Sequence, residues 1–491
     1  MLSVVFVTVL CFGFTITNFS IGVDDPSRNY YLYSNNLGSM IQQGRLMHIV
    51  LNSLTHSVQF VPFFTDFMGA ALYALSTLLY CALFQYVTGG KISSAALTGF
   101  CCVYISSSVL VEKYIYQLDV IAVMLSYCLS AVALLYGFRF VKEKKPRLFI
   151  LACVCLMGAL GSYESFLFLY FCGVFGIFIL EIVVNKENKS FMELLREGLQ
   201  YAAILLVSVV IYYSLVYFLQ VFTGQHGVFV RDNFWTYSDV GAVATFLEIT
   251  RSFINFFMDS IRARYLPILV FLLFSGIGFA LCGILAFRLK NFWLLPCCFA
   301  LWFGNFFIHY FSGSFMLRTA QTFCFFVGFV LLLLIDFSAV WDLLRKTVLA
   351  ATVLLVFVQS ADMNRWFYND YIRYQKEVFA INTIATELVA ECDLSKSVIF
   401  TGRPDFAYLN TAQYSGRQVN GNSVVYWSIE AFSDPTQPFV AELFRMHGYD
   451  FIRSPDEDQY RQAWELAESM PAWPQAGYMQ EFEDFTVVNF G

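Results

Sequence analysis

Charged side chains are scarce in this sequence. Only 13% of its 491 residues are Asp, Glu, Lys or Arg, whereas soluble domains carry about 25%. Hydrophobic residues make up 58% of the chain, and the formal net charge is −6. The composition therefore excludes an ordinary soluble protein, and the lack of a strongly basic segment excludes a nucleic acid as a partner.

Spacings typical of metal and redox sites are also missing. Twelve of the 13 cysteines lie in apolar segments, where we interpret them as small buried hydrophobic residues. No two cysteines form Cys-x-x-Cys, and no two of the five histidines have the spacing of metal ligands. The adjacent Asp24 and Asp25 could hold a divalent ion, but we expect neither a metal nor an organic cofactor.

Long hydrophobic runs, by contrast, are abundant. A helix needs ~20 mainly apolar residues to cross a bilayer, and eleven segments of the chain approach or exceed that length. The expected fold class is an α-helical polytopic membrane protein with about eleven transmembrane helices. The candidate spans are residues 2–20, 60–87, 93–111, 120–141, 148–160, 165–184, 200–221, 265–286, 292–311, 319–341 and 347–360.

Lysine and arginine are distributed unevenly between alternate connections. One set of short connections holds 13 of these residues, which places it in the cytoplasm by the positive-inside rule. The other set holds eight across much longer loops, including 21–59 and 223–264, which are patterned like amphipathic helices at the membrane surface. We therefore expect a multi-pass plasma-membrane protein with its N-terminus in the cytoplasm and its C-terminus outside.

The composition changes near Ser360. Residues 361–491 hold 19 acidic and 9 basic residues and no run of bilayer length. We therefore predict a membrane domain over 1–360 and a small extracytoplasmic α/β domain over 361–491. In the second domain the spacing of apolar residues predicts a helix over 371–392. Short strands are predicted at 397–401, 449–452 and 485–490.

A pair of carboxylates follows the first predicted span. Asp24 and Asp25 precede Pro26 and Arg28, and Gly44-Arg45 follows about 20 residues later. One carboxylate could act as a general base that deprotonates an acceptor hydroxyl. Alternatively, the pair caps the helix that begins at Pro26, because Pro suits the first turn of a helix. Both interpretations remain open.

These motifs and three later ones resemble a known family. The later ones are Gly161-Ser-Tyr-Glu-Ser-Phe166, Arg318 and the segment Met470–Tyr478. Together they resemble the bacterial type II serotype-converting glucosyltransferases, membrane enzymes of the GT-C superfamily. The resemblance implies transfer of a hexose, with glucose as the default, from a polyprenyl-phosphate donor to a surface glycan such as an O-antigen. It also implies that an acidic residue of the first outer loop is the base.

Cations at the outer ends of the spans suit such a donor. A departing phosphate becomes a dianion, which nearby positive groups would stabilise. Snorkelling to the membrane interface explains the same side chains without a ligand. The candidate donor-phosphate ligands are Arg28, Arg45, Lys113 and Arg318.

Two further residues are candidates for sugar binding. Tyr163 and Glu164 lie between two apolar segments, where a carboxylate needs a partner or a water-filled cavity. A structural ion pair is the alternative for Glu164. Glu112, Gln117 and Asp119, in a short connection, could also line such a cavity, but we favour their interpretation as solvated turn residues. The mixed aromatic and polar residues 225–235 suit either carbohydrate recognition or anchoring at the interface.

The predicted function is therefore transfer of a hexose on the outer face of the membrane. Its partners would be the lipid-linked donor, a glycan acceptor and membrane lipid. A transporter or flippase of lipid-linked sugars is one alternative, although the polar residues gather at the outer span ends rather than in mid-membrane. A non-catalytic subunit of an envelope complex is the other.

Overall fold

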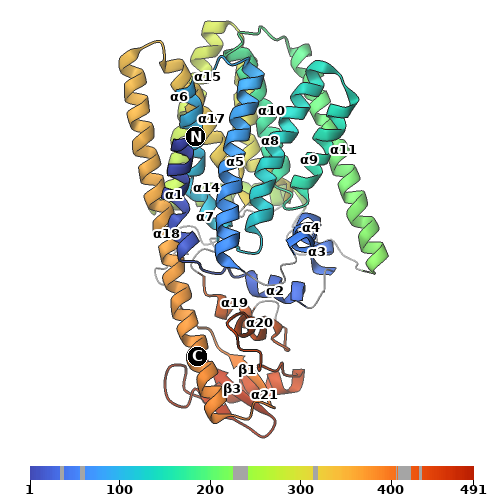
Figure 1. The fold of residues 1–491 in the computed structure, drawn as a ribbon, viewed down its shortest axis with the longest axis vertical. Helices are drawn as coiled ribbons and strands as arrows, with labels where there is room; N and C mark the ends of the chain where they lie inside the picture. The colour runs from blue at the N-terminus through green and yellow to red at the C-terminus, as the bar shows by residue number, and fades with distance from the viewer. Residues whose placement is uncertain are drawn as a thin grey trace.

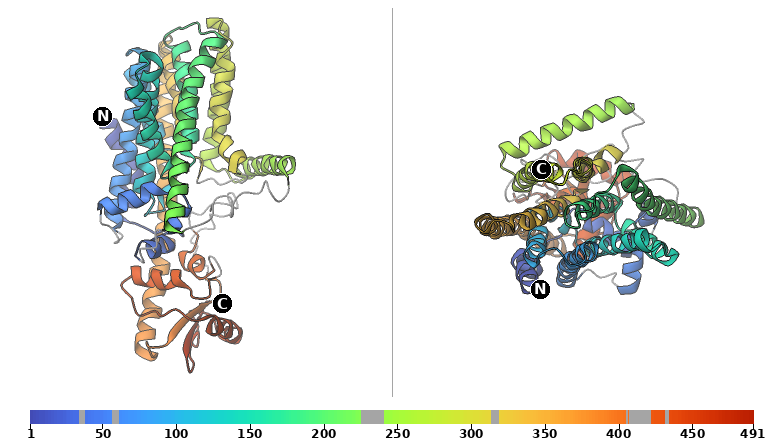
Figure 2. Two further views of the ribbon diagram at one scale, coloured as in Figure 1. Left: turned by 90° about the vertical axis from the view of Figure 1, so that its right-hand side faces the viewer. Right: turned by 90° about the horizontal axis from the view of Figure 1, so that it is seen from above.

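A computed structural model of the chain describes residues 1–33, 38–55, 61–224, 241–312, 319–404, 406, 422–430 and 434–491. Long helices form a bundle, and a smaller unit of helices and strands lies at one end of it (Figures 1 and 2). Seven of the described helices are long and apolar enough to cross a membrane. They are α5 (Pro62–Thr88), the stretch Ser94–Tyr114, α8 (Val120–Glu143), α10 (Phe166–Val183), α11 (Phe191–Thr223), α15 (Leu266–Leu289) and α18 (Asp342–Glu391).

Four shorter apolar helices coincide with the remaining predicted spans. The helical, membrane-spanning class is thereby confirmed, while the count of eleven crossings stays a prediction. The stretch Ser94–Tyr114 consists of α6 (Ser94–Ile105), a 3-10 turn (Ser108–Leu110) and α7 (Val111–Tyr114). The shorter apolar helices are α1 (Leu2–Thr17), α9 (Pro146–Leu160), α16 (Leu294–Ser312) and α17 (Thr322–Ser338).

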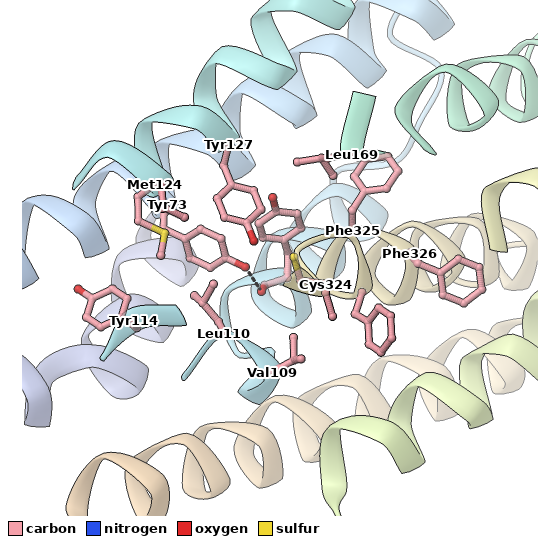
Figure 3. Packing of buried hydrophobic residues seen from close by; sticks show 14 of the residues in the cluster. Tyr73, Val109, Leu110, Tyr114, Met124, Tyr127, Leu169, Cys324, Phe325 and Phe326 are labelled. Atoms are coloured by element: carbon pink, nitrogen blue, oxygen red, sulfur yellow. Dashed lines mark hydrogen bonds between the residues drawn. The ribbon is translucent and has the colours of Figure 1, made fainter. Parts of the chain in front are cut away.

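Aromatic side chains fill the centre of the bundle (Figure 3). Tyr73 of α5 is fully buried, and its ring meets that of Tyr127 of α8 edge to face, with centroids 5.1 Å apart. Its hydroxyl donates a hydrogen bond to the main-chain carbonyl of Tyr104, at 3.0 Å. Close packing and bonds of this kind hold helices together in lipid, where burial from water contributes little.

One helix lies across the bundle axis rather than along it. This is α14 (Ala242–Arg262), which projects sideways near the ends of the spans (Figure 2). Ile249 and Phe253 are buried against the protein, whereas Leu247 and Ile254 are exposed on another side. An exposed apolar side on a helix in this orientation suits the membrane interface. The structure thus agrees with the amphipathic pattern over the described part of the 223–264 loop, residues 241–264.

The helix α18 links the bundle to the tail (Figure 1). It has 50 residues, which corresponds to a length of about 75 Å at 1.5 Å per residue. The predicted span 347–360 and the predicted helix 371–392 are both parts of it. The predicted boundary at residue 360 therefore falls inside a continuous helix.

The tail contains a three-stranded sheet in the order β1-β3-β2. The strands β1 (Ser397–Thr401) and β3 (Phe485–Asn489) pair in parallel, and β2 (Met479–Glu481) pairs with β3 antiparallel. Strands β1 and β3 agree with the strands predicted at 397–401 and 485–490. The strand predicted at 449–452 is wrong, because that segment does not pair with any strand of the sheet. The residues that follow it make only a single main-chain hydrogen bond with the start of β1. The helices of the tail are α19 (Val424–Glu430), α20 (Pro438–Met446) and α21 (Glu457–Ala467).

Candidate functional site

Three short helices follow α1 and lie where the bundle meets the tail (Figure 1). They are α2 (Asp25–Tyr33), α3 (Gly38–Gln42) and α4 (Leu46–Thr55). Because this region corresponds to the first predicted outer loop, it holds the carboxylate pair and the Gly-Arg motif. All three helices are too short to cross a bilayer.

Basic side chains from four segments converge here on one carboxylate, Asp119. Its oxygens lie 3.5 Å from Nε of Arg28 on α2, 3.2 Å from a guanidinium nitrogen of Arg45, and 3.9 Å from Nζ of Lys113 on α7. Nδ1 of His48 on α4 lies 3.4 Å away. We call these five residues the Asp119 cluster. It unites three of the four predicted phosphate ligands.

The cations of the Asp119 cluster keep its central carboxylate ionised. Burial raises the pKa of Asp119, but His48, Arg45 and Lys113 together outweigh it and lower that pKa to about 2. Burial also lowers the pKa of His48, although Asp119 opposes that effect. Three cations therefore contact one ionised, buried carboxylate at the ends of the spans.

Tyr163 and Glu164 border the Asp119 cluster. Nζ of Lys113 lies 3.7 Å from the centroid of the Tyr163 ring, and Cζ of Arg45 lies 5.2 Å from it. Cation–π contacts of this kind hold a cation in place without neutralising it. Burial raises the pKa of Glu164, while Arg45 and Lys113 act to lower it. The structure thus brings both predicted sugar ligands beside the predicted phosphate ligands.

The two adjacent carboxylates have different surroundings. Asp25 is 1% exposed and accepts main-chain hydrogen bonds from Gly22 at 2.7 Å, Gln117 at 3.2 Å and Leu118 at 3.1 Å. It thereby ties the first loop to the turn that precedes Asp119. Glycine is required at 22, because a Cβ there would lie 2.9 Å from a main-chain oxygen. Asp24, by contrast, is partly exposed.

Burial raises the pKa of Asp25 to about 8, with its main-chain bonds acting in the opposite direction. At neutral pH the neutral form therefore predominates. An ordinary aspartate titrates near 3.9, so folding favours the protonated acid. This stabilisation is complete below about pH 4 and is lost as the pH rises through about 8.

The variant Asp25→Asn tests this assignment, because asparagine imitates the neutral acid. The wild-type protein in detergent should lose on the order of 1 kcal/mol of stability for each pH unit between about 4 and 8 from this group, because in that range only the unfolded state has released the proton. The variant should lack that component, so its melting temperature should fall less between about pH 5 and 8. Parallel curves for the two proteins would contradict the raised pKa.

The predictions from sequence were incomplete at this site. The interpretation of Asp119 as a solvated turn residue is wrong, since its side chain is 7% exposed and surrounded by cations. The sequence does not indicate the contact of His48 with Asp119, because the two residues are distant along the chain. Arg318 and the segment 225–235 lie outside the described residues, so their roles stay predictions.

The side chains that could ligate a metal are dispersed in the described part of the chain. Within it, no three His, Cys, Asp or Glu side chains gather closely enough to hold an ion. The expectation that the protein works without a metal or cofactor remains a prediction.

Comparison with known proteins gives one family match, which covers most of the chain. A family model described as Glucosyl transferase GtrII matches residues 13–358. This range contains every predicted site residue and confirms the resemblance inferred from the motifs. No curated protein and no solved structure matches the chain significantly. The chain belongs to the glucosyl transferase GtrII family and is a membrane glycosyltransferase.

Proposed function

We propose that this protein transfers a hexose, glucose by family, from a polyprenyl-phosphate donor to a glycan on the outer face of the membrane. One observation carries the proposal. Three cations converge on Asp119, beside a loop that holds a partly exposed carboxylate. A negatively charged leaving group and a hydroxyl nucleophile require that combination.

In the proposed reaction, the Asp24 carboxylate takes the proton from an acceptor hydroxyl. The hydroxyl oxygen forms a bond to the anomeric carbon of the donor, while the bond from that carbon to the phosphate oxygen breaks. The bonding electrons stay on the phosphate, which leaves as polyprenyl phosphate with one more negative charge. Arg28, Arg45 and Lys113 stabilise that developing charge.

The choice of Asp24 over Asp25 rests on protonation and access. Asp25 is buried, accepts three main-chain bonds and has its pKa raised to about 8. A carboxyl that is mainly neutral near pH 7 is a poor proton acceptor, and its burial keeps it from an acceptor hydroxyl. Asp24 precedes it in the same loop and is partly exposed. We therefore assign the base to Asp24 and a structural role to Asp25.

The position of the Asp119 cluster suits a lipid-linked donor. Lys113 lies at the end of the apolar stretch Ser94–Tyr114, and Asp119 immediately precedes the span α8. Side chains at the ends of spans lie near the headgroups, where the phosphate of a polyprenyl lipid also lies. A donor that moves laterally in the bilayer can therefore reach the cations without leaving it.

The proposal requires that this end of the bundle faces outward. The α8–α9 connection lies at the opposite end from the tail (Figure 1). Single cysteines in residues 142–147 should therefore resist a membrane-impermeant maleimide in intact cells, whereas cysteines in the exposed parts of 434–491 should react. A background without the native cysteines serves as control. Equal protection of both sites would contradict the orientation.

The class of donor is tested with isolated membranes. Membranes containing the protein should transfer labelled hexose to added glycan from a polyprenyl-phosphate donor, and not from a nucleotide-linked one. Membranes without the protein give the background. Transfer from the nucleotide sugar in the absence of lipid donor would overturn the proposal. The family match speaks against the flippase and the non-catalytic subunit, and both of these predict no transfer at all.

A further inference from the structure

A buried arginine of α18 joins the tail to the first outer loop. Arg373 is 1% exposed, and one guanidinium nitrogen donates to the main-chain carbonyl of Ile21 at 2.7 Å. The same nitrogen pairs with Asp370 at 3.0 Å, and the other terminal nitrogen pairs with Glu377. The arginine therefore bonds the loop three residues before Asp24.

Both carboxylate partners of Arg373 have further bonds. Asp370 accepts a hydrogen bond from the hydroxyl of Ser20, in the same loop. Glu377 accepts main-chain bonds from Val424 at 2.6 Å and Val425 at 3.2 Å, at the start of α19. Two consecutive loop residues are thus bound to α18, and α18 is bound to the tail helix α19.

The tail makes a second contact on the other side of the carboxylate pair. Glu442 of α20 accepts a hydrogen bond from Asn29 at 2.5 Å, adjacent to Arg28 of the Asp119 cluster. Phe439 of α20 packs against Tyr30, with ring centroids 5.9 Å apart. Tail contacts therefore flank the Asp24–Arg28 segment, at residues 20–21 before it and at residues 29–30 after it.

We infer that the tail positions the first outer loop, which holds Asp24 and Arg28. Arg373 is the positioning residue through which the tail acts. This inference rests on the proposed function, because it is Asp24 and Arg28 whose placement matters for transfer. The tail would then contribute to the chemical step even where it does not touch the acceptor. A tail that only captured acceptor would affect the KM for the glycan and not the kcat.

Arg373→Lys is the informative variant. Lysine keeps one positive charge between Asp370 and Glu377, so no buried carboxylate is left without a cation. It cannot maintain the fork that reaches both carboxylates and the Ile21 carbonyl together. The variant should therefore fold and insert while the loop loses its anchor.

The matched control is Arg365→Lys on the same helix. Arg365 pairs with Asp362 three residues earlier, as Arg373 does with Asp370, but its side chain is 51% exposed. Because its guanidinium reaches solvent and bonds no described residue of a loop, Arg365 should tolerate the exchange even though Asp362 is buried. Ser20→Ala is a second test, because it removes the bond to Asp370 without changing any charge.

The experiment measures transfer kinetics and amide hydrogen exchange on the full-length protein in detergent. A displacement of 1 Å at a reacting group can lower a rate about 100-fold. We expect Arg373→Lys to lower kcat about 10- to 100-fold with both KM values within about twofold, and to speed exchange in a peptide spanning 18–33. Ser20→Ala should also lower kcat and speed exchange over 18–33, but by smaller factors. Arg365→Lys should match the wild type in both measurements.

The outcomes separate this inference from the proposed function. A wild-type kcat in Arg373→Lys, or unchanged exchange over 18–33, would overturn the positioning role. A raised glycan KM at constant kcat would do the same and assign the tail to acceptor capture. Absence of hexose transfer by the wild type would remove the proposed function. Exchange would then still decide whether Arg373 fixes the loop.

Discussion

Replacing Asp24 by asparagine is expected to lower the rate of hexose transfer about 10²- to 10⁴-fold. The amide has nearly the shape of the carboxylate but cannot accept a proton from the acceptor hydroxyl. Because Asp24 is partly exposed, the exchange should change neither insertion nor abundance. The measurement is the initial rate of transfer from polyprenyl-phosphate hexose, with protein amount determined by immunoblot.

Asp25→Asn is the matched control for Asp24→Asn, because the same exchange is made one residue away. It should reduce transfer less than Asp24→Asn does, since asparagine replaces an acid that is mainly neutral at pH 7, although its amide nitrogen cannot accept the main-chain bonds of one carboxylate oxygen. The reverse ranking, with Asp25→Asn inactive and Asp24→Asn active, would transfer the base to Asp25. If both variants kept the full rate, neither carboxylate would be the base.

Truncating Arg45 is expected to have the next largest effect. Arg45 is more exposed than the other cations of the Asp119 cluster, with 18% of its side chain accessible. A hydrogen bond to a charged group contributes about 1.5–3 kcal/mol, and each 1.4 kcal/mol changes a rate or binding constant tenfold. Arg45→Met should therefore lower kcat/KM for the donor about 10- to 100-fold, while the KM for the glycan stays nearly constant.

Arg45→Lys distinguishes phosphate binding from snorkelling. Snorkelling requires only a positive charge, so in that case Arg45→Lys would leave kcat/KM for the donor almost unchanged. A phosphate held by two parallel bonds requires the guanidinium fork, and lysine should then give an intermediate loss. Arg262→Met is the control, because that arginine is 75% exposed at the end of α14. Wild-type donor dependence in Arg45→Met would remove this residue from the donor site.

Local sequence patterns predicted the elements of the fold well. Long apolar runs identify helices such as α5 and α10 because a bilayer selects length and hydrophobicity directly. Apolar spacing in the tail predicted the helix 371–392, and Ile381, Ile384 and Leu388 are indeed buried along α18. The failed strand at 449–452 shows the limit of this reasoning. A short apolar run becomes a strand only when a neighbouring strand is available to pair with it.

The composition of the site could be predicted only in part. Positions at the outer ends of the predicted spans indicated Arg28, Arg45 and Lys113 one at a time. Their convergence depends on Asp119, which contacts both Arg28 and Arg45. Along the chain, however, it is 91 residues from Arg28 and 74 residues from Arg45. No spacing rule covers such distances. The link from Arg373 to Ile21, 352 residues apart, is hidden from sequence for the same reason.

Reconstitution into sealed vesicles tests the proposed reaction most directly. The purified protein is placed in vesicles with labelled polyprenyl-phosphate hexose, glycan is added outside, and the orientation of the tail is determined by protease. Labelled glycan and polyprenyl phosphate should form in equal amounts, and only in vesicles whose tail faces the glycan. Two results would contradict the proposed reaction: transfer in vesicles whose tail is enclosed, or labelling of glycan without release of polyprenyl phosphate.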